Sequence, residues 1–257
     1  MGKITAIANQ KGGVGKTTSA INISASLAAT GPKVLLIDTD PQGNSTSGLG
    51  IDKESLNGSL YDLYTENKSI QEIVINTNVD QLSIIASNID LIGAELELTD
   101  KEGRESLLKH ALETLRPQFD YIYIDCPPSL SLLTLNALVA ANSLLIPMQC
   151  EYYALEGISM LLRTFELIKN SYNPSLEIEG ILLTMFDQRN SLANQVTSEL
   201  KKHFGDKVYQ TVIPRNVTLA EAPSHGKPVI YYDIRSKGAQ SYLELAKEII
   251  GNETGTW

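Results

Sequence analysis

The segment NQKGGVGKTT (residues 9–18) decides how the rest of the chain is interpreted. It follows a β-rich run at 3–9 and precedes a stretch with a helical pattern that we expect to end at Gly31. A strand, a glycine-rich turn, a Lys-Thr pair and a helix in this order predict a loop that binds phosphate groups. Glycines let backbone N–H groups turn inward around phosphate oxygens, and the helix N-terminus adds a partial positive charge.

The loop departs from the usual phosphate-binding pattern at its beginning. The register set by Gly15, Lys16 and Thr17 puts Gln10 where the first glycine normally stands, and a second lysine, Lys11, follows directly. We expect Lys16 to reach the β- and γ-phosphates of a nucleotide and the Thr17 hydroxyl to bind Mg²⁺. The expected nucleotide-binding residues of this loop are Gly12, Gly13, Val14, Gly15, Lys16, Thr17 and Thr18, and the role of Lys11 is left open by the pattern.

Short β-rich runs alternate with helical patterns along the chain, which predicts strands that are joined by helices. Several of the runs are almost continuously apolar, as is typical of parallel strands that are covered on both faces. We therefore expect an α/β fold of three layers, a doubly wound and mostly parallel sheet with helices on both faces, of the P-loop NTPase type. The expected strands are 3–9, 33–38, 81–86, 121–125, 143–148, 178–184 and 207–212.

Three amphipathic helices are predicted from apolar residues at helical spacing. They lie within 107–115, 155–168 and 192–204, and the apolar stripe of each is expected to face the core.

The bulk composition is that of a globular protein. The 257 residues are 42% hydrophobic and 20% charged, with a net charge of −9, which argues against a surface that binds nucleic acid all over. No apolar run approaches the roughly 18 residues of a membrane span, and the N-terminus lacks a signal-peptide pattern, so we expect a cytoplasmic protein. Cys126 and Cys150 fit neither a disulfide framework nor a zinc site, and two buried thiols are expected.

Three aspartates stand where predicted strands end. Asp125 ends the run 121–125 in the position of a Walker B aspartate, which acts on Mg²⁺ directly or through water. Asp38 ends the run 33–38 and Asp40 comes two residues later; we expect Asp38 to be structural and Asp40 to orient the attacking water. Because ligands of doubly wound sheets bind at the carboxyl ends of the strands, these carboxylates should meet the phosphate loop. The expected metal site consists of Thr17, Asp40 and Asp125.

Five blocks of this sequence closely resemble the ParA/Soj chromosome-partitioning ATPases, of the ParA/MinD group. The similarity runs from about residue 1 to 250, so we expect a single deviant Walker A ATPase domain over 1–257. The blocks are KGGVGKTT (11–18), DTDPQGNSTSGLG (38–50), IDCPPSL (124–130), QCEYYALEG (149–157) and VIPRNVTLAEAPSHGKP (212–228).

The resemblance implies a role for the second lysine of the loop. In this family the lysine at the position of Lys11 reaches across a dimer interface to the phosphates of the ATP that is bound to the other subunit. A lysine supplied in trans places positive charge where negative charge develops in the transition state. The expected catalytic residues are therefore Lys11, Lys16 and Asp40, with ATP and Mg²⁺ as the nucleotide and cofactor.

The resemblance also implies partners. Family members form an ATP-dependent homodimer, bind double-stranded DNA without sequence specificity on the nucleoid, and are released when a ParB-type centromere-binding protein stimulates hydrolysis. Adenine is usually held by the loops after the later strands, which implies contacts from Met185, Pro214 and Asn216.

A basic segment is the candidate DNA-binding surface. Residues 201–237 carry seven Lys/Arg against three Asp/Glu, and the resemblance adds Arg189, whereas Thr218 stands where relatives often have arginine. The candidate DNA-binding residues are Arg189, Lys201, Lys202, Arg215, Lys227, Arg235 and Lys237.

Other functions of the same loop remain open at this point. A MinD-like cell-division ATPase would need a basic amphipathic C-terminal helix for membranes, but the C-terminal stretch 241–257 contains three glutamates. Two further relatives fit poorly, since neither the cysteines of an iron–sulfur reductase nor the terminal tyrosine cluster of an autokinase is in place. An ATP-switched regulator that acts mainly through protein partners is the main alternative to partitioning.

Overall fold

One seven-stranded sheet organises the part of the chain that the computed structural model describes, residues 2–151 and 154–254. The strand order is β3-β4-β2-β5-β1-β6-β7, and only β3 runs antiparallel to its neighbour. The strands are β1 Lys3–Ile7, β2 Val34–Asp38, β3 Val74–Asn76, β4 Leu82–Ile85, β5 Tyr121–Asp125, β6 Ser143–Gln149 and β7 Glu177–Thr184.

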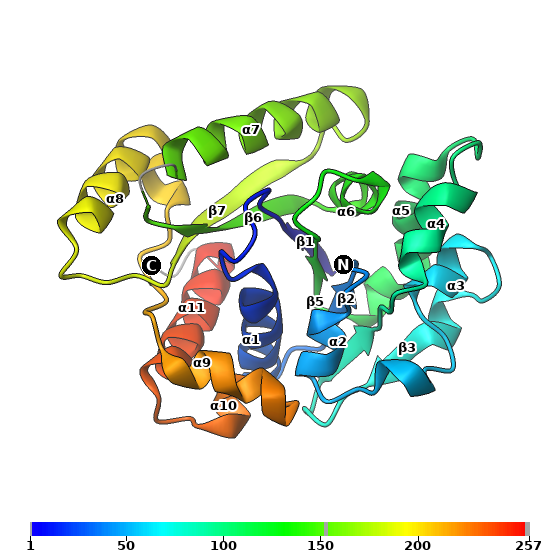
Figure 1. Cartoon of the computed structure of the whole chain (residues 1–257), viewed down its shortest axis with the longest axis horizontal. Coiled ribbons are helices and arrows are strands. Elements are labelled where there is room, and N and C mark those ends of the chain that lie inside the picture. The colour runs from blue at the N-terminus through cyan, green and yellow to red at the C-terminus, as the bar shows by residue number, and fades with distance from the viewer. Residues whose placement is uncertain (1, 152–153, 255–257) are drawn as a thin grey trace.

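Helices cover both faces of this sheet, as Figure 1 shows. One buried cluster joins the sheet to α3–α8, and a second joins its other face to α1 and α9–α11. The fold class expected from the sequence is confirmed. The α-helices are α1 Lys16–Ala28, α2 Asn44–Gly48, α3 Leu60–Tyr64, α4 Leu91–Glu97, α5 Leu107–Leu115, α6 Leu132–Ala140, α7 Ala154–Ser171, α8 Ser191–Phe204, α9 Val217–Glu221, α10 Val229–Tyr232 and α11 Lys237–Thr254.

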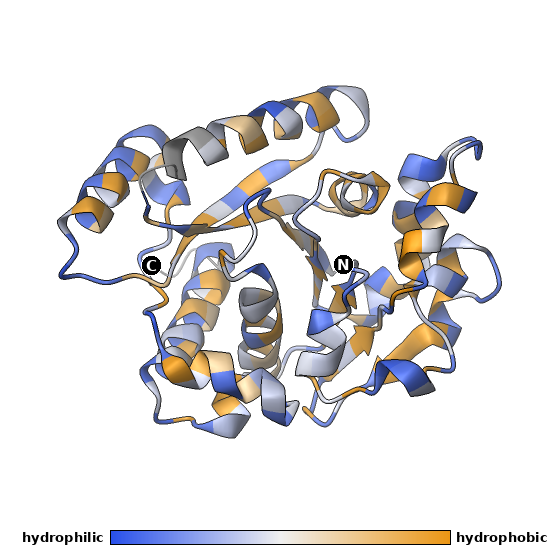
Figure 2. Ribbon diagram, viewed as in Figure 1, coloured by the Kyte–Doolittle hydropathy of each residue, from blue (hydrophilic) through white to orange (hydrophobic). Residues whose placement is uncertain are grey.

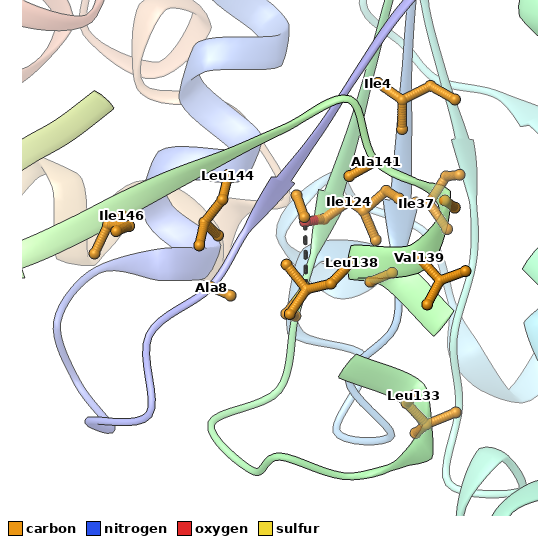
Figure 3. Close-up of a cluster of buried hydrophobic side chains, with 14 of the residues drawn as sticks. Ile4, Ala8, Ile37, Ile124, Leu133, Leu138, Val139, Ala141, Leu144 and Ile146 are labelled. Atoms are coloured by element: carbon orange, nitrogen blue, oxygen red, sulfur yellow. Dashed lines mark hydrogen bonds between the residues drawn. The ribbon is translucent and has the colours of Figure 1, made fainter. Parts of the chain in front are cut away.

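The central strands are apolar because both of their faces are buried. Every residue of β2 and β5 is buried, and Figure 2 shows hydrophobic residues along the strands. Ile37 and Ile124 pair across these two strands, and both pack beside Leu138 of α6 (Figure 3). Burying each such side chain contributes about 1.5–3 kcal/mol relative to exposure. None of the described helices is long and apolar enough to span a membrane.

The strand expected at 207–212 was wrong. A 3₁₀ turn ends at Lys207, and Val208 makes a single bridge to Ile181 of β7. The N–H groups of Gln210 and Thr211 donate instead to the Glu248 carboxylate on α11, at 2.7 and 2.9 Å. A side chain from the C-terminal helix therefore takes the donors that a strand would use. The three-residue edge strand β3 was not expected from the sequence.

Two glycines hold α2 close to the segment that follows α9. Gly50 (φ 77°) and Gly226 (φ 60°) both have left-handed backbones, and a Cβ added to Gly226 would lie 2.6 Å from the Cα of Gly50. No side chain fits between the two backbones, so both the conformation and the close approach require glycine.

We expect Gly226→Ala to lower the free energy of unfolding more than Gly103→Ala. Both substitutions place a Cβ on a left-handed backbone, which costs about 1–2 kcal/mol. Only the alanine at 226 also collides with backbone, because the nearest atom to a Cβ at Gly103 lies 4.0 Å away, and such overpacking costs roughly 1–3 kcal/mol more. Urea unfolding of both variants measures the difference, and equal losses would contradict the close contact.

Candidate nucleotide-binding site

A cleft of about 610 Å³ opens at the carboxyl ends of the central strands. The phosphate loop and the start of α1 form one wall, the segment after β2 forms another, and the segment after β5 completes it. The lining includes Gly12, Gly13, Gly15, Lys16, Thr17, Thr18, Asp40, Pro41, Gln42, Pro127, Pro128, Ser129 and Met185. The expected loop and the expected Asp40 therefore share one cavity of a size that is typical of small-molecule sites.

The loop is shaped by its glycines and is tied to the sheet. Gly13 (φ 73°) and Gly15 (φ 86°) adopt left-handed backbones, which turn the chain before α1 begins. The Val14 side chain is buried, and its carbonyl accepts a 2.8 Å hydrogen bond from the Thr184 hydroxyl at the end of β7. Val14 can therefore offer only backbone atoms to the cleft, while its side chain anchors the loop.

Lys16 lies at the floor of the cleft. Its side chain is mostly buried, and its Nζ donates to the Lys11 carbonyl at 3.3 Å. Burial lowers the pKa of Lys16, and the negative charge of Asp125 opposes that shift. A desolvated ammonium held next to a glycine-rich loop is well placed to bind phosphate oxygens, which restore the contacts it has lost.

Two buried aspartates stand side by side below the loop. Asp38 and Asp125 pair in register at the ends of β2 and β5, and both are fully buried. Burial raises the pKa of both carboxyls. Thr46 donates to Asp38 from its backbone N–H (2.9 Å) and from its hydroxyl (2.8 Å), and Ser45 donates to Asp125 at 2.8 Å. The expectation that Asp38 is structural agrees with these contacts.

Ser45 and Thr46 were missed by the sequence reasoning. They follow Asn44 in the first turn of α2 and fix this helix on the two carboxylates, and the Thr46 hydroxyl also accepts from the N–H of Ser87 at 3.0 Å. A hydroxyl after an aspartate loop has no diagnostic spacing. The block DTDPQGNSTSGLG contains both residues, but nothing in it separates them from the other serines and threonines.

The donor set fits a magnesium ion. Asp125 Oδ1 is buried and accepts no hydrogen bond of ordinary geometry, whereas the other oxygen of this carboxylate is satisfied by Ser45. The Thr17 hydroxyl lies close enough to Asp125 to oppose the rise of its pKa. An unpaired buried carboxylate oxygen is costly unless a ligand supplies a positive charge. Thr17 and Asp40 line the same cleft, so hydroxyl and carboxylate oxygens, the ligands that Mg²⁺ prefers, converge there.

The expected adenine contacts line a smaller pocket of about 210 Å³. Met185, Pro214 and Asn216 all border it, and Gly15, Thr18 and Met185 line both this pocket and the larger cleft. Met185 has a positive φ of 48°, a rare conformation for a side chain of this size. The arrangement leaves room for a flat, mostly apolar group beside the phosphate loop.

Lys11 does not point into the cleft. Its Nζ forms an ion pair with Glu151, the second residue after β6, and both side chains are about half exposed. Lys16 and Asp40 therefore lie in the cavity, whereas Lys11 is directed away from it. Tyr152 and Tyr153 of the block QCEYYALEG lie outside the described residues.

The candidate DNA-binding residues do not form one cluster. Lys201 and Lys202 belong to α8, which packs on one face of the sheet, whereas Lys227, Arg235 and Lys237 lie among α9–α11 on the other (Figure 1). All seven candidates are exposed, so each is accessible to a phosphate backbone. Arg189 is already paired with Asp187 at 2.8 Å, Lys202 is paired with Glu199 at 2.5 Å, and Arg215 borders the smaller pocket.

The fold and this site define a P-loop nucleotide-binding protein. A family model described as an AAA domain matches residues 2–178. The chain is 57% identical over 252 residues to the sporulation initiation inhibitor protein Soj of Bacillus subtilis, covering 98% of this chain and 100% of that protein. It is 52% identical over 254 residues to the chromosome partitioning protein ParA of Myxococcus xanthus, covering 99% and 90%. The chain belongs to the ParA/Soj family of chromosome-partitioning ATPases.

Solved structures share the whole fold. A protein from Mycobacterium smegmatis described as cobyrinic acid a,c-diamide synthase, with bound ADP and magnesium, matches with a TM-score of 0.87 and 36% identity over 100% of this chain and 97% of that one. The septum site-determining protein MinD of Pyrococcus horikoshii, complexed with Mg-ADP, matches with a TM-score of 0.78 and 26% identity over 97% and 96%.

We expect Lys16→Ala to abolish nucleotide binding, because the phosphates lose their buried ammonium partner while the fold loses only a desolvated charge. Equilibrium dialysis with ATP and Mg²⁺ measures the loss. Lys33→Ala, which changes an exposed lysine directly before β2 and so at the amino ends of the strands, serves as the control and should bind like the unmodified chain. An unchanged ATP affinity in Lys16→Ala would remove the assignment of this cleft.

Proposed function

We propose that this protein is a partitioning ATPase that hydrolyses ATP, binds DNA without sequence specificity as an ATP-dependent sandwich dimer, and is released on hydrolysis stimulated by a ParB-type partner. The observation that supports it best is the unpaired Oδ1 of Asp125 below the phosphate loop, in a chain that is 57% identical to Soj of Bacillus subtilis. A cleft that holds Lys16 and Asp40, with the buried carboxyl of Asp125 close to both, is suited to a nucleotide with its metal ion.

Different residues at the cleft bind the phosphates, hold the metal ion and position the attacking water. The backbone of the loop and Lys16 bind the phosphates, and Thr17 and Asp125 hold Mg²⁺, which neutralises charge on the phosphates when it is bound. Asp40 orients the attacking water. Its N–H donates to Asp38 Oδ1 at 3.1 Å, and its own Oδ1 accepts from the Gln42 N–H at 2.9 Å, so the carboxylate is already fixed in direction.

Lys11 completes the site of a second subunit in this proposal. It comes directly before Gly12, which lines the cleft, and its half-exposed side chain can turn toward another molecule once its ion pair with Glu151 breaks. Dimerisation then depends on ATP, because the phosphates bound to each subunit neutralise the Lys11 side chain of the other subunit.

The DNA contacts are proposed for two separate faces. Phosphate contacts from lysines and arginines make affinity fall steeply with salt. For each phosphate that the protein neutralises, a tenfold rise in salt concentration lowers the DNA affinity by roughly tenfold. Lys227, Arg235 and Lys237 share one face with α9–α11, and Lys201 and Lys202 occupy another, so charge reversal on each face separately identifies the one that contacts DNA.

A second candidate is a regulator that acts through protein partners, with hydrolysis as a timer. The printed name of the relative at 57% identity, sporulation initiation inhibitor protein, is the observation that favours it. We do not propose amide synthesis, since the M. smegmatis protein with that name is 36% identical, well below the 50–57% of the partition relatives. A MinD-like membrane role has less support, because Glu248 of α11 is engaged within the fold.

The experiment that tests the proposal is binding to random duplex DNA at low salt, with ADP and with ATP, using Asp40→Ala as the trapped form. Binding with ATP alone, lost as salt rises, supports the partition function. An absence of binding in every nucleotide state contradicts it and favours the regulator.

We expect Asp40→Ala to bind ATP and dimerise but not to hydrolyse it, because the phosphate contacts remain and the water loses its acceptor. Phosphate release measures the rate, with Asp80→Ala, an exposed aspartate before β4, as the control. Hydrolysis by Asp40→Ala at the unmodified rate means that another group positions the water.

We expect Lys11→Ala to bind ATP but to remain monomeric. Its own cleft keeps Lys16, whereas the partner's phosphates lose their trans lysine. Light scattering with and without ATP reports the mass, and an ATP-dependent dimer of this variant is the result that the proposal forbids.

A further inference from the structure

The topology brings Lys11 and Glu151 to the same edge of the sheet. β1 and β6 are neighbouring parallel strands, so the loop after β1 and the residues after β6 leave the sheet in the same direction. Asn9 fixes the two segments together. Its Nδ2 donates to the Pro147 carbonyl at 2.8 Å, and its Oδ1 accepts from the Lys11 N–H at 3.0 Å.

This anchoring sets the backbone of Lys11 within reach of the carboxylate. Lys11 Nζ pairs with Glu151 Oε2, and the two side chains are 44% and 50% exposed. The Gln149 side chain also holds Glu151 in place. With the Gln149 amide oriented so that donors meet acceptors, its nitrogen donates to Glu151 Oε1 at 3.0 Å and its oxygen accepts from Arg215 at 3.3 Å.

We propose that Glu151 is a positioning residue that holds Lys11 within its own subunit and so opposes ATP-dependent dimerisation. The inference rests on the proposed function, in which Lys11 acts on the nucleotide of a second subunit. One side chain cannot pair with Glu151 and reach a partner's phosphates together, so the ion pair must break before the lysine serves in trans.

The Lys11–Glu151 ion pair, called the latch below, is weak enough to break reversibly. An exposed ion pair shifts an equilibrium by up to about fivefold. A symmetric dimer breaks two such pairs, so the two factors multiply to as much as roughly 25-fold in the dimer dissociation constant. Both groups are half exposed and become hydrated after release, which leaves no buried charge behind.

The test compares Glu151→Gln with the unmodified chain. Sedimentation with a non-hydrolysable ATP analogue measures the dimer dissociation constant, and we expect the variant to dimerise several-fold to about 25-fold more tightly. ADP affinity should not change, because Glu151 does not line the cleft. Glu151→Asp keeps the charge and should restore most of the opposition to dimerisation.

Glu66→Gln is the matched control. It removes the carboxylate of the Lys101–Glu66 pair, another exposed ion pair with the same 2.5 Å separation, from a different part of the fold. This variant should dimerise like the unmodified chain. The salt dependence shows whether the effect comes from the ion pair. Because salt screens the pair, the tighter dimerisation of Glu151→Gln should approach that of the unmodified chain as the salt concentration rises.

The outcomes separate this inference from the proposed function. If Lys11→Ala dimerises with ATP, the trans lysine itself is wrong. If Lys11→Ala stays monomeric but Glu151→Gln matches the unmodified chain, the latch alone is overturned. Weaker dimerisation of Glu151→Gln, or an advantage that persists at high salt, also overturns it, because Glu151 would then act within the dimer or through shape.

Discussion

The pairing of Asp38 with Asp125 at the ends of two adjacent buried strands is the constraint on which the site depends. Two carboxylates in the core raise each other's cost of ionisation, and the fold offsets that cost with donors from the start of α2. One oxygen, on Asp125, is left over. The same geometry that builds the hydrophobic sheet therefore places an unsatisfied carboxyl group close to Lys16, at the base of the loop that binds phosphates.

Much of the fold was predictable because its signals are local. The glycine loop, the apolar strands and the amphipathic helices are each written in a short window of sequence, and the fold class followed from their alternation. The two failures have different causes, a contact between distant residues and a strand that is too short. The run at 207–212 has the composition of a strand, but its N–H groups are taken by Glu248, and β3 is too short to show an alternating pattern.

The site was predictable to the same extent. Lys16 is marked by the glycine loop, and Asp40 and Asp125 are marked by their place at the ends of strands. The structure places Lys16 and Asp40 in one cleft and buries Asp125 close to both. No sequence pattern distinguishes Ser45 and Thr46, since their importance comes from the carboxylates to which they donate. The basic segment 201–237 was misleading in a different way, because the chain passes from one face of the sheet to the other between α8 and α9 and separates charges that are close in sequence.

The segment that failed to become a strand has its own consequence at the outer edge of β7. Tyr209 donates to the carbonyl of Ile181, and Ile213 donates to that of Leu183, so acceptors along this edge are occupied by an irregular piece of chain. A regular eighth strand would have presented a fresh row of donors and acceptors to other molecules, which is a template for edge-to-edge aggregation. The irregular cover ends the sheet, as the three-residue β3 does at the opposite edge. If the protein dimerises through the face that carries the nucleotide cleft, as proposed, this cover keeps it from joining other copies through its sheet.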